Sequence, residues 1–191
     1  MNRIVSGTVK AAGSLAVVGG VLVASAMPAG AVTLPRSWGA QATGTTSLPQ
    51  VALAWAGNTY QSALNVSAPP ILSTGFILDR AGPNTAYSSV TSPAVSIASA
   101  LALVSATKVA STCDTGTAQD STVWGGTIRQ YGQPTIKLPL KPAINTQIQI
   151  PGGVTITLNK RNIYVGIRQV TAMYVAWSGQ NVSLGVSRCA G

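Results

Sequence analysis

The 191-residue chain contains no histidine and no glutamate, and its carboxylate side chains are Asp79, Asp114 and Asp120. General acid–base catalysis, metal ligation and triad-type nucleophilic catalysis draw mainly on histidine and on paired carboxylates. The composition therefore predicts a protein that is not an enzyme and that uses no metal or cofactor.

Lysine is the one general base left for a serine or threonine nucleophile. After residue 31 the candidates are Lys108, Lys137, Lys141 and Lys160. Serine and threonine are so abundant that chance proximity explains such a pair more simply than catalysis does. A Lys–Asn isopeptide bond is a second chemistry open to lysine, and it needs a buried acid. The three aspartates stand in turn-like contexts, which argues against it.

A calcium site is the remaining candidate for carboxylate chemistry. Asp114 and Asp120 flank one loop, with Thr115, Thr117 and Gln119 as further oxygen donors. Calcium takes six to eight oxygen ligands, several of them usually carboxylate. Two carboxylates are a weak set, so a solvated turn is the favoured interpretation.

Two cysteines, Cys113 and Cys189, predict one structural disulfide. The space outside the membrane is oxidising, and the chain has no C-x-x-C pair of the kind that redox enzymes use. The bond would close a long loop and contribute on the order of 4 kcal/mol in the chain-entropy model. It would hold the last strand against the middle of the chain.

Trp124, Arg129 and Tyr131 form the candidate ligand surface. Alternate residues of a strand face the same way, so Arg129 and Tyr131 share a side. Trp124 joins them only if Gly125-Gly126 forms a bulge that inserts one residue. The alternative is that these aromatic residues pack into the core or against a sheet face, as is common in sandwich proteins.

The chain is strongly basic, with twelve Lys and Arg residues, three Asp residues and a formal net charge of +9. Such a balance can attract anionic wall polymers, phospholipid head groups or nucleic acid. After residue 31 the basic residues are scattered, with Lys160 and Arg161 as the adjacent pair, so solubility charge is the favoured interpretation. Anionic cell-wall polymer, glycan or other surface proteins are the candidate partners, and no nucleic acid is expected.

Residues 1–31 have the pattern of a cleaved secretory signal peptide. Arg3 and Lys10 precede an apolar stretch over 11–27, and Ala29-Gly30-Ala31 is a cleavage site that makes Val32 the mature N-terminus. Ala24-Ser25-Ala26 is a second candidate cleavage site, and an uncleaved membrane anchor is the other alternative. No later run is long enough for a transmembrane helix, so we expect a secreted or surface-associated protein with one domain over residues 32–191.

The mature sequence is rich in Val, Ile and Thr and lacks long amphipathic helical patterns, which indicates a β protein. Residues 32–50 are predicted to be an irregular arm with one edge strand at most. Residues 51–55 and 60–66 are predicted to be partner strands. A further strand is expected over 71–78, followed by a turn at 79–84.

Residues 94–113 suit either strands or a helix, and their parity favours one long or two successive strands. The last third alternates clearly, with strands expected over 144–150 and 154–158 and a hairpin formed by 170–177 and 182–189. These elements predict an all-β antiparallel sandwich with jelly-roll or immunoglobulin-like topology.

The C-terminal half carries a family resemblance. A strand at 127–130 is followed by Gly132-Gln133-Pro134, Asn145-Thr146-Gln147-Ile148, Pro151-Gly152-Gly153 and Val154-Thr155-Ile156-Thr157-Leu158-Asn159. This run resembles the "G-x-P … N-T-x-I-x-x-P-G … V-T-L-N-E" pattern of exported actinobacterial modules called choice-of-anchor P proteins. The resemblance covers 94–191 and departs from the pattern at Lys160, where the family commonly has an acidic residue. It implies a surface-associated or secreted β-sandwich and supplies no catalytic residue.

These observations predict an exported, non-enzymatic structural or adhesive protein of the cell surface. The alternative is a secreted binding module for anionic glycan or cell-wall polymer, which would use exposed aromatic and basic residues. An oligomeric β-barrel pore ranks third, because the strand signal is no stronger than that of an ordinary sandwich.

Overall fold

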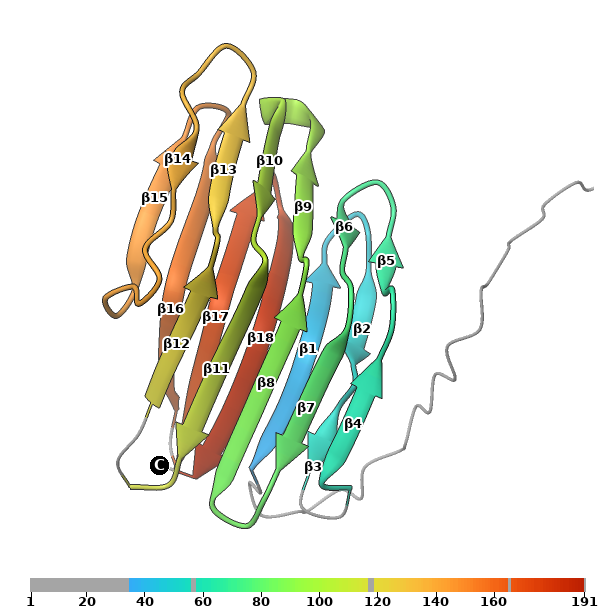
Figure 1. Cartoon of the computed structure of the whole chain (residues 1–191), viewed down its shortest axis with the longest axis vertical. Helices are drawn as coiled ribbons and strands as arrows, with labels where there is room; N and C mark the ends of the chain where they lie inside the picture. The colour runs from blue at the N-terminus through green and yellow to red at the C-terminus, as the bar shows by residue number, and fades with distance from the viewer. Residues whose placement is uncertain (1–34, 56–57, 117–118, 165, 191) are drawn as a thin grey trace, which may run out of the picture.

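The computed structural model of the protein describes residues 35–55, 58–116, 119–164 and 166–190. The predicted signal peptide, residues 1–31, lies outside the described residues and stays a prediction. Two antiparallel layers pack face to face (Figure 1). The first layer is one sheet with the order β15-β16-β17-β18-β1-β2, in which β3 also pairs with β1. Its strands are β1 (Arg36–Thr43), β2 (Leu48–Val51), β3 (Ala54–Trp55), β15 (Thr146–Ile150), β16 (Val154–Tyr164), β17 (Ile167–Trp177) and β18 (Gln180–Ala190).

The second layer consists of two sheets that lie end to end (Figure 1). One has the order β12-β11-β8-β7-β4 and the other β14-β13-β10-β9-β6-β5. The strands of the first are β4 (Tyr60–Ala63), β7 (Ile77–Ala81), β8 (Thr85–Thr91), β11 (Lys108–Asp114) and β12 (Gln119–Trp124). Those of the second are β5 (Ser67–Ala68), β6 (Leu72–Ser73), β9 (Ala94–Ile97), β10 (Ala102–Ser105), β13 (Thr127–Gln130) and β14 (Ile136–Lys137).

Strands of one sheet continue into strands of the other after short breaks, as β8 does into β9 and β12 into β13 (Figure 1). Hydrogen bonds bridge neighbouring breaks: the Ser92 N–H donates to the Thr107 carbonyl at 2.8 Å, and the Thr107 N–H to the Trp124 carbonyl at 2.9 Å. Ser92 and Gly125 have left-handed backbones, with φ of 46° and 58°. The breaks therefore form a row that divides the layer.

The predicted all-β antiparallel sandwich is confirmed. Within the second layer, strands that are close in sequence are neighbours in space, so the chain follows a meander before it enters β15. The last strand, β18, then pairs with the first, β1. This order differs from the Greek-key order of jelly-roll and immunoglobulin sandwiches.

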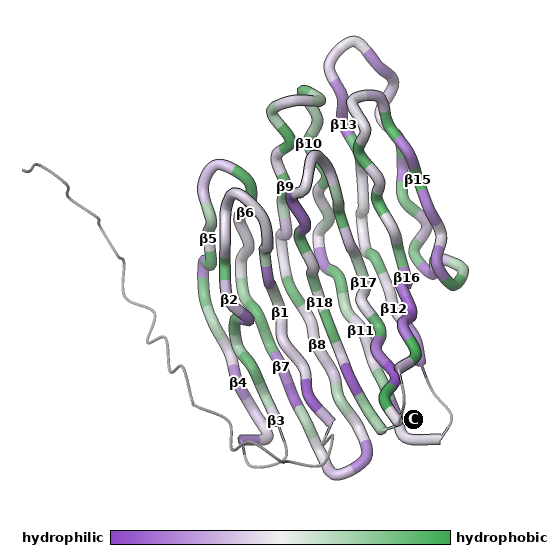
Figure 2. Tube along the Cα trace, turned by 180° about the vertical axis from the view of Figure 1, so that it is seen from behind, coloured by the Kyte–Doolittle hydropathy of each residue, from purple (hydrophilic) through white to green (hydrophobic). Residues whose placement is uncertain are grey.

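The core lies between the layers and is built from aliphatic side chains at alternate strand positions. The largest fully buried ones include Ile77, Ile128, Ile156, Leu158 and Leu184. Hydrophobic and hydrophilic residues are interspersed along the strands (Figure 2), as expected for strands with one buried face.

The predicted disulfide is confirmed. Cys113 on β11 is bonded to Cys189 on β18, and the two Cα atoms are 5.6 Å apart. The bond therefore joins the two layers, with Val170 packed beside it.

Along the long strands of the first layer, the set of alternate residues that faces the second layer changes. In β18, Leu184 packs into the core on the N-terminal side of Gly185, so even-numbered positions face the second layer there. On the C-terminal side the odd-numbered Ser187 faces it instead and donates to Ser111 Oγ at 2.9 Å. Gly185 has a φ of 62°. In β16 the same change occurs at Asn159, whose φ is 49°. After each residue the other set of alternate positions faces the second layer, while the pairing register of the strands is unchanged.

The predicted irregular arm is wrong. Residues 36–43 form β1, which lies inside the first layer with β18 on one side and β2 and β3 on the other. Its small residues misled the prediction, and the structure shows why one of them is needed. A Cβ on Gly39 would lie 2.1 Å from Ile77 Cγ2, so only glycine lets β1 approach β7 this closely.

Two further predictions in the N-terminal half are wrong. Residues 51–55 do not pair with 60–66, because β2 and β3 pair with β1 while β4 pairs with β7 in the other layer. The strand expected over 71–78 is divided into β6 and β7. Since β7 continues to Ala81, Asp79 is a buried strand residue and not part of a turn.

The preference for strands over 94–113 is confirmed. Strands β9, β10 and β11 occupy this stretch, with a short 3-10 turn, η1 (Ala98–Ala100), between β9 and β10. The predicted C-terminal hairpin is also confirmed and is formed by β17 and β18.

Candidate functional site

The predicted trio Trp124, Arg129 and Tyr131 is exposed but does not form one surface. Trp124 is 38% exposed and Tyr131 is 84% exposed, so neither is a core residue. The predicted irregularity at Gly125-Gly126 does occur: β12 buries Val123 and β13 buries Ile128, which places Trp124 and Arg129 on the same outer face. They are nevertheless five residues apart, roughly 16 Å along an extended chain at about 3.3 Å per residue.

Trp124 lines a shallow hollow on the outer face of the second layer. The hollow has a volume of about 200 Å³, and Ala110 lies among the larger side chains of Tyr87, Asp120 and Trp124. The Nζ of Lys108 lies 5.1 Å from the centre of the Trp124 ring. Lys108 is therefore a surface cation beside an aromatic ring.

Arg129 and Tyr131 line a separate and larger cleft, which we call the end cleft. It lies where η1 and the ends of β10 and β13 meet the β17–β18 turn, and its volume is about 910 Å³. Apolar side chains that include Ile71, Leu101 and Trp177 line most of it.

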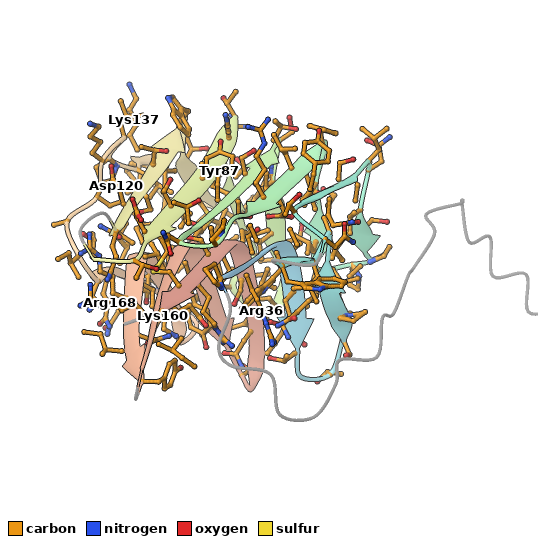
Figure 3. All side chains as sticks on the ribbon, turned by 90° about the horizontal axis from the view of Figure 1, so that it is seen from below. Arg36, Tyr87, Asp120, Lys137, Lys160 and Arg168 are labelled. Atoms are coloured by element: carbon orange, nitrogen blue, oxygen red, sulfur yellow. A yellow bond between two sulfur atoms is a disulfide. The ribbon has the colours of Figure 1, made fainter. Side chains whose placement is uncertain are left out.

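The outer face of the first layer carries a cluster of cations that the sequence does not reveal. We call it the basic face and define it by Arg36, Lys160 and Arg188 with the rings of Trp38 and Tyr174. Arg36 and Arg188 occupy directly paired positions on β1 and β18. Figure 3 shows Arg36, Lys160 and Arg168 on the first layer, opposite Tyr87 and Asp120 on the second.

Two cations of the basic face are held over aromatic rings. The Arg188 guanidinium carbon lies 5.2 Å from the centre of the Trp38 ring, and Lys160 Nζ lies 3.3 Å from the centre of the Tyr174 ring. Arg188 also donates from Nη2 and Nε to Gln169 Oε1 at 2.6 and 3.2 Å. These contacts hold the positive charges in place on the sheet.

The basic face has no acidic side chain to balance it. Asp79, Asp114 and Asp120 all belong to strands of the second layer. Burial lowers the pKa of Arg188, the charge of Arg36 lowers it further, and Tyr164 opposes the shift. Burial also lowers the pKa of Lys160. Both shifts mean that the folded protein holds these positive charges at a cost, which a bound anion would reduce.

Two of the candidate general bases, Lys108 and Lys160, lie over aromatic rings. Asp120 Oδ1 accepts a hydrogen bond from the Ser121 N–H at 2.8 Å. Within the described ranges, no group of three or more His, Cys, Asp or Glu side chains could hold a metal ion. The Asp114 and Asp120 pair therefore gains no further carboxylate ligand from the fold.

Asp79 is the one buried carboxyl group of the described chain. Its exposed fraction is 0%, and neither carboxyl oxygen has a hydrogen-bond partner among the described residues. Burial raises its pKa well above the ordinary value, while Ser88 and the Gly39 N–H oppose the shift without reaching hydrogen-bond geometry. No lysine faces it across the paired positions of β4 and β8, which are Gln61 and Ser88.

Comparisons with protein-family models, curated proteins and solved structures found no match to this chain. The resemblance to choice-of-anchor P modules therefore stays a prediction. No helix among the described residues is long and apolar enough to cross a membrane.

Proposed function

We propose that the protein is an exported, non-enzymatic module that adheres to anionic polymers of the cell surface through the basic face. The observation that carries this proposal is the cross-strand pair of Arg36 and Arg188, in a layer without acidic side chains. Like charges directly opposite each other destabilise a sheet. A bound anionic group would attract both guanidinium groups and offset the repulsion between them.

The arrangement of the cations favours a polymer over a single ion. Lys160 lies on β16 and Arg36 on β1, three strands away. At about 4.8 Å between neighbouring strands, these two strands are roughly 14 Å apart. A chain with repeated negative charges can reach both positions, whereas a small anion reaches only one. The side-chain amide of Gln169, beside Arg188, can additionally bind hydroxyl or carboxylate groups of a glycan.

The placement of the aromatic rings supports a polysaccharide rather than a nucleic acid. Proteins that hold single-stranded nucleic acid stack its bases on exposed aromatic side chains. Here the Trp38 ring is only 3% exposed and lies beneath Arg188, and Lys160 lies against the Tyr174 ring. These rings hold cations and leave little area for a base.

The proposed export rests on the predicted signal peptide and is compatible with the observed disulfide, because such bonds persist in oxidising compartments. The proposed lack of enzymatic activity rests on the absence of histidine and glutamate. Adhesion requires neither residue.

The test is binding of the oxidised, mature protein to isolated cell wall and to dextran sulfate, with neutral dextran as the blank. We expect binding at 50 mM salt that is lost at 0.5 M salt, where the screening length falls to about 4 Å. Arg36→Gln/Arg188→Gln should weaken it at least 10-fold. Lys137→Gln/Lys141→Gln removes the same charge from exposed positions outside the first layer and should have a much smaller effect.

Equal losses in the two double variants would show that only the total charge matters and would overturn the basic face as the site. Tighter binding to single-stranded DNA than to either polyanionic glycan would overturn the assignment to polysaccharide. Binding to neutral dextran at high salt would overturn the electrostatic mechanism.

A further inference from the structure

The end cleft is large enough for a small molecule and has an asymmetric lining. Its volume of about 910 Å³ lies within the range of ligand sites, roughly 300 to 1,000 Å³. Leu101 and Leu103 supply exposed apolar surface, and the core residues Ile71 and Trp177, each 9% exposed, add their outer edges. Arg129 is the one charged side chain among the lining residues. The cleft thus combines a mostly apolar lining with a single positive charge.

The walls of the end cleft are fixed by two glutamine side chains. Gln180 Nε2 donates to the carbonyls of Thr43 and Thr46 at 2.9 Å each, and Gln180 Oε1 accepts from the Thr46 N–H at 2.9 Å. These bonds join the β17–β18 turn to the β1–β2 turn. On the other side, Gln130 Nε2 donates to the Ala100 carbonyl at 3.2 Å. These hydrogen bonds fix both walls of the cleft.

Leu101 is held in an unusual conformation at the cleft. It is 67% exposed, and its φ and ψ of 45° and 44° lie in the left-handed region that leucine rarely adopts. The Tyr131 N–H donates to the Leu101 carbonyl at 3.1 Å, which couples the two lining residues. Backbone strain of this kind concentrates at functional sites, and here it keeps an apolar side chain at the cleft instead of in the core.

We propose that the end cleft binds a long-chain carboxylic acid. The alkyl chain passes over Leu101 at the end of the layer, from the exposed edges of Ile71 and Trp177 on the inner side towards the outer face. There the carboxylate pairs with the Arg129 guanidinium, with the Tyr131 hydroxyl as a second donor. A guanidinium and a carboxylate form two parallel hydrogen bonds. One cation matches one negative charge, which favours a monoanionic carboxylate over a phosphate dianion.

This inference is independent of the proposed function. β18 runs from Gln180 at the end cleft to Arg188 at the basic face, and the two positions are roughly 27 Å apart at about 3.4 Å per residue. Variants at one site therefore leave the other intact.

The test uses the oxidised, mature protein and hexadecanoate, added below its critical micelle concentration, with Trp177 as a fluorescent reporter inside the cleft. We expect a saturable change with one acid per protein that is absent in Trp177→Phe. Hexadecanol should bind at least 10-fold more weakly than the acid. Arg129→Gln should remove this difference, because it should weaken binding of the acid at least 10-fold and leave binding of the alcohol unchanged.

Controls separate a lost site from a lost fold. Leu101→Glu should weaken the binding of both the acid and the alcohol. A circular dichroism melt should show that this exposed residue is not needed for folding. Arg80→Gln, an exposed arginine of β7, and Arg36→Gln/Arg188→Gln should bind the acid like the wild type. Non-saturable binding by the wild type, equal binding of acid and alcohol, or unchanged acid binding by Arg129→Gln would each overturn the proposal.

Discussion

Arg36 and Arg188 come from opposite ends of the described chain and lie directly opposite each other on β1 and β18. Arg188 is fixed by Gln169 and Trp38, so the pair cannot easily separate. The two arginines thus occupy paired positions in a layer without an acidic side chain, and the proposed binding of an anionic polymer rests on this pair.

The repulsion between these arginines should be measurable in the free protein. We expect Arg36→Gln to raise the free energy of unfolding by about 0.5 kcal/mol at low ionic strength, as for other like-charge cross-strand pairs. The gain should disappear in 0.5 M salt, where the charges are screened. Urea unfolding at both salt concentrations tests this, with Lys137→Gln as the control. A stability gain that persists at high salt would contradict the electrostatic explanation.

Added polyanion should stabilise the wild-type protein, because a ligand that binds only the folded state raises its melting temperature. Dextran sulfate should therefore raise the melting temperature of the wild type and of Lys137→Gln/Lys141→Gln. It should have little effect on Arg36→Gln/Arg188→Gln. Differential scanning fluorimetry in low salt is sufficient, and a shift of equal size in all three proteins would argue against the basic face.

Asp79 should make stability fall as the pH rises. Because burial raises its pKa, the folded protein keeps the carboxyl proton to a higher pH than the unfolded chain does. The contribution is fully present below the ordinary pKa of 3.8 and is lost as the pH rises through the raised value. Asp79→Asn should remove this loss and be more stable than the wild type at neutral pH. Urea midpoints from pH 4 to 8 measure it, with Asp120→Asn on the exposed face as the control.

The disulfide should contribute about 4 kcal/mol, because it closes a loop with a sequence separation of 76 residues. Cys113→Ser/Cys189→Ser should lose roughly this amount in urea unfolding. Thiol labelling of the unreduced, denatured wild type should find no free thiol. Stoichiometric labelling would show that the bond does not form in the isolated protein.

Gly39→Ala should destabilise the protein by about 1 to 3 kcal/mol, the usual effect of overpacking a core. The added Cβ would lie 2.1 Å from Ile77 Cγ2, so β1 and β7 would have to separate. Gly82→Ala is the matched control, since its nearest contact is the end of the Thr85 side chain at 3.2 Å. Equal melting temperatures for both variants would show that the two layers are more loosely packed than in this structure.

The sequence by itself was sufficient for the fold class, the C-terminal hairpin and the disulfide. In β15 and the first half of β16 the alternation of Ile, Val and Leu with Gln and Thr is strong, and this local signal does not depend on distant partners. With only two cysteines, just one intramolecular pairing is available. The N-terminal strand β1 was missed because its Ser, Gly and Ala residues have little strand propensity, and pairing on both sides outweighs that preference.

Only the tertiary structure decided which side chains share a surface. Lys160 follows Ile156 and Leu158 with the same parity, so alternation alone directs it into the core. The left-handed backbone of Asn159 shifts the alternation and turns Lys160 outward onto Tyr174. The pairing of Arg36 with Arg188 depends in the same way on a register between strands far apart in sequence. Register and bulges arise from contacts between distant segments, and for this reason the basic face could not be read from the order of residues.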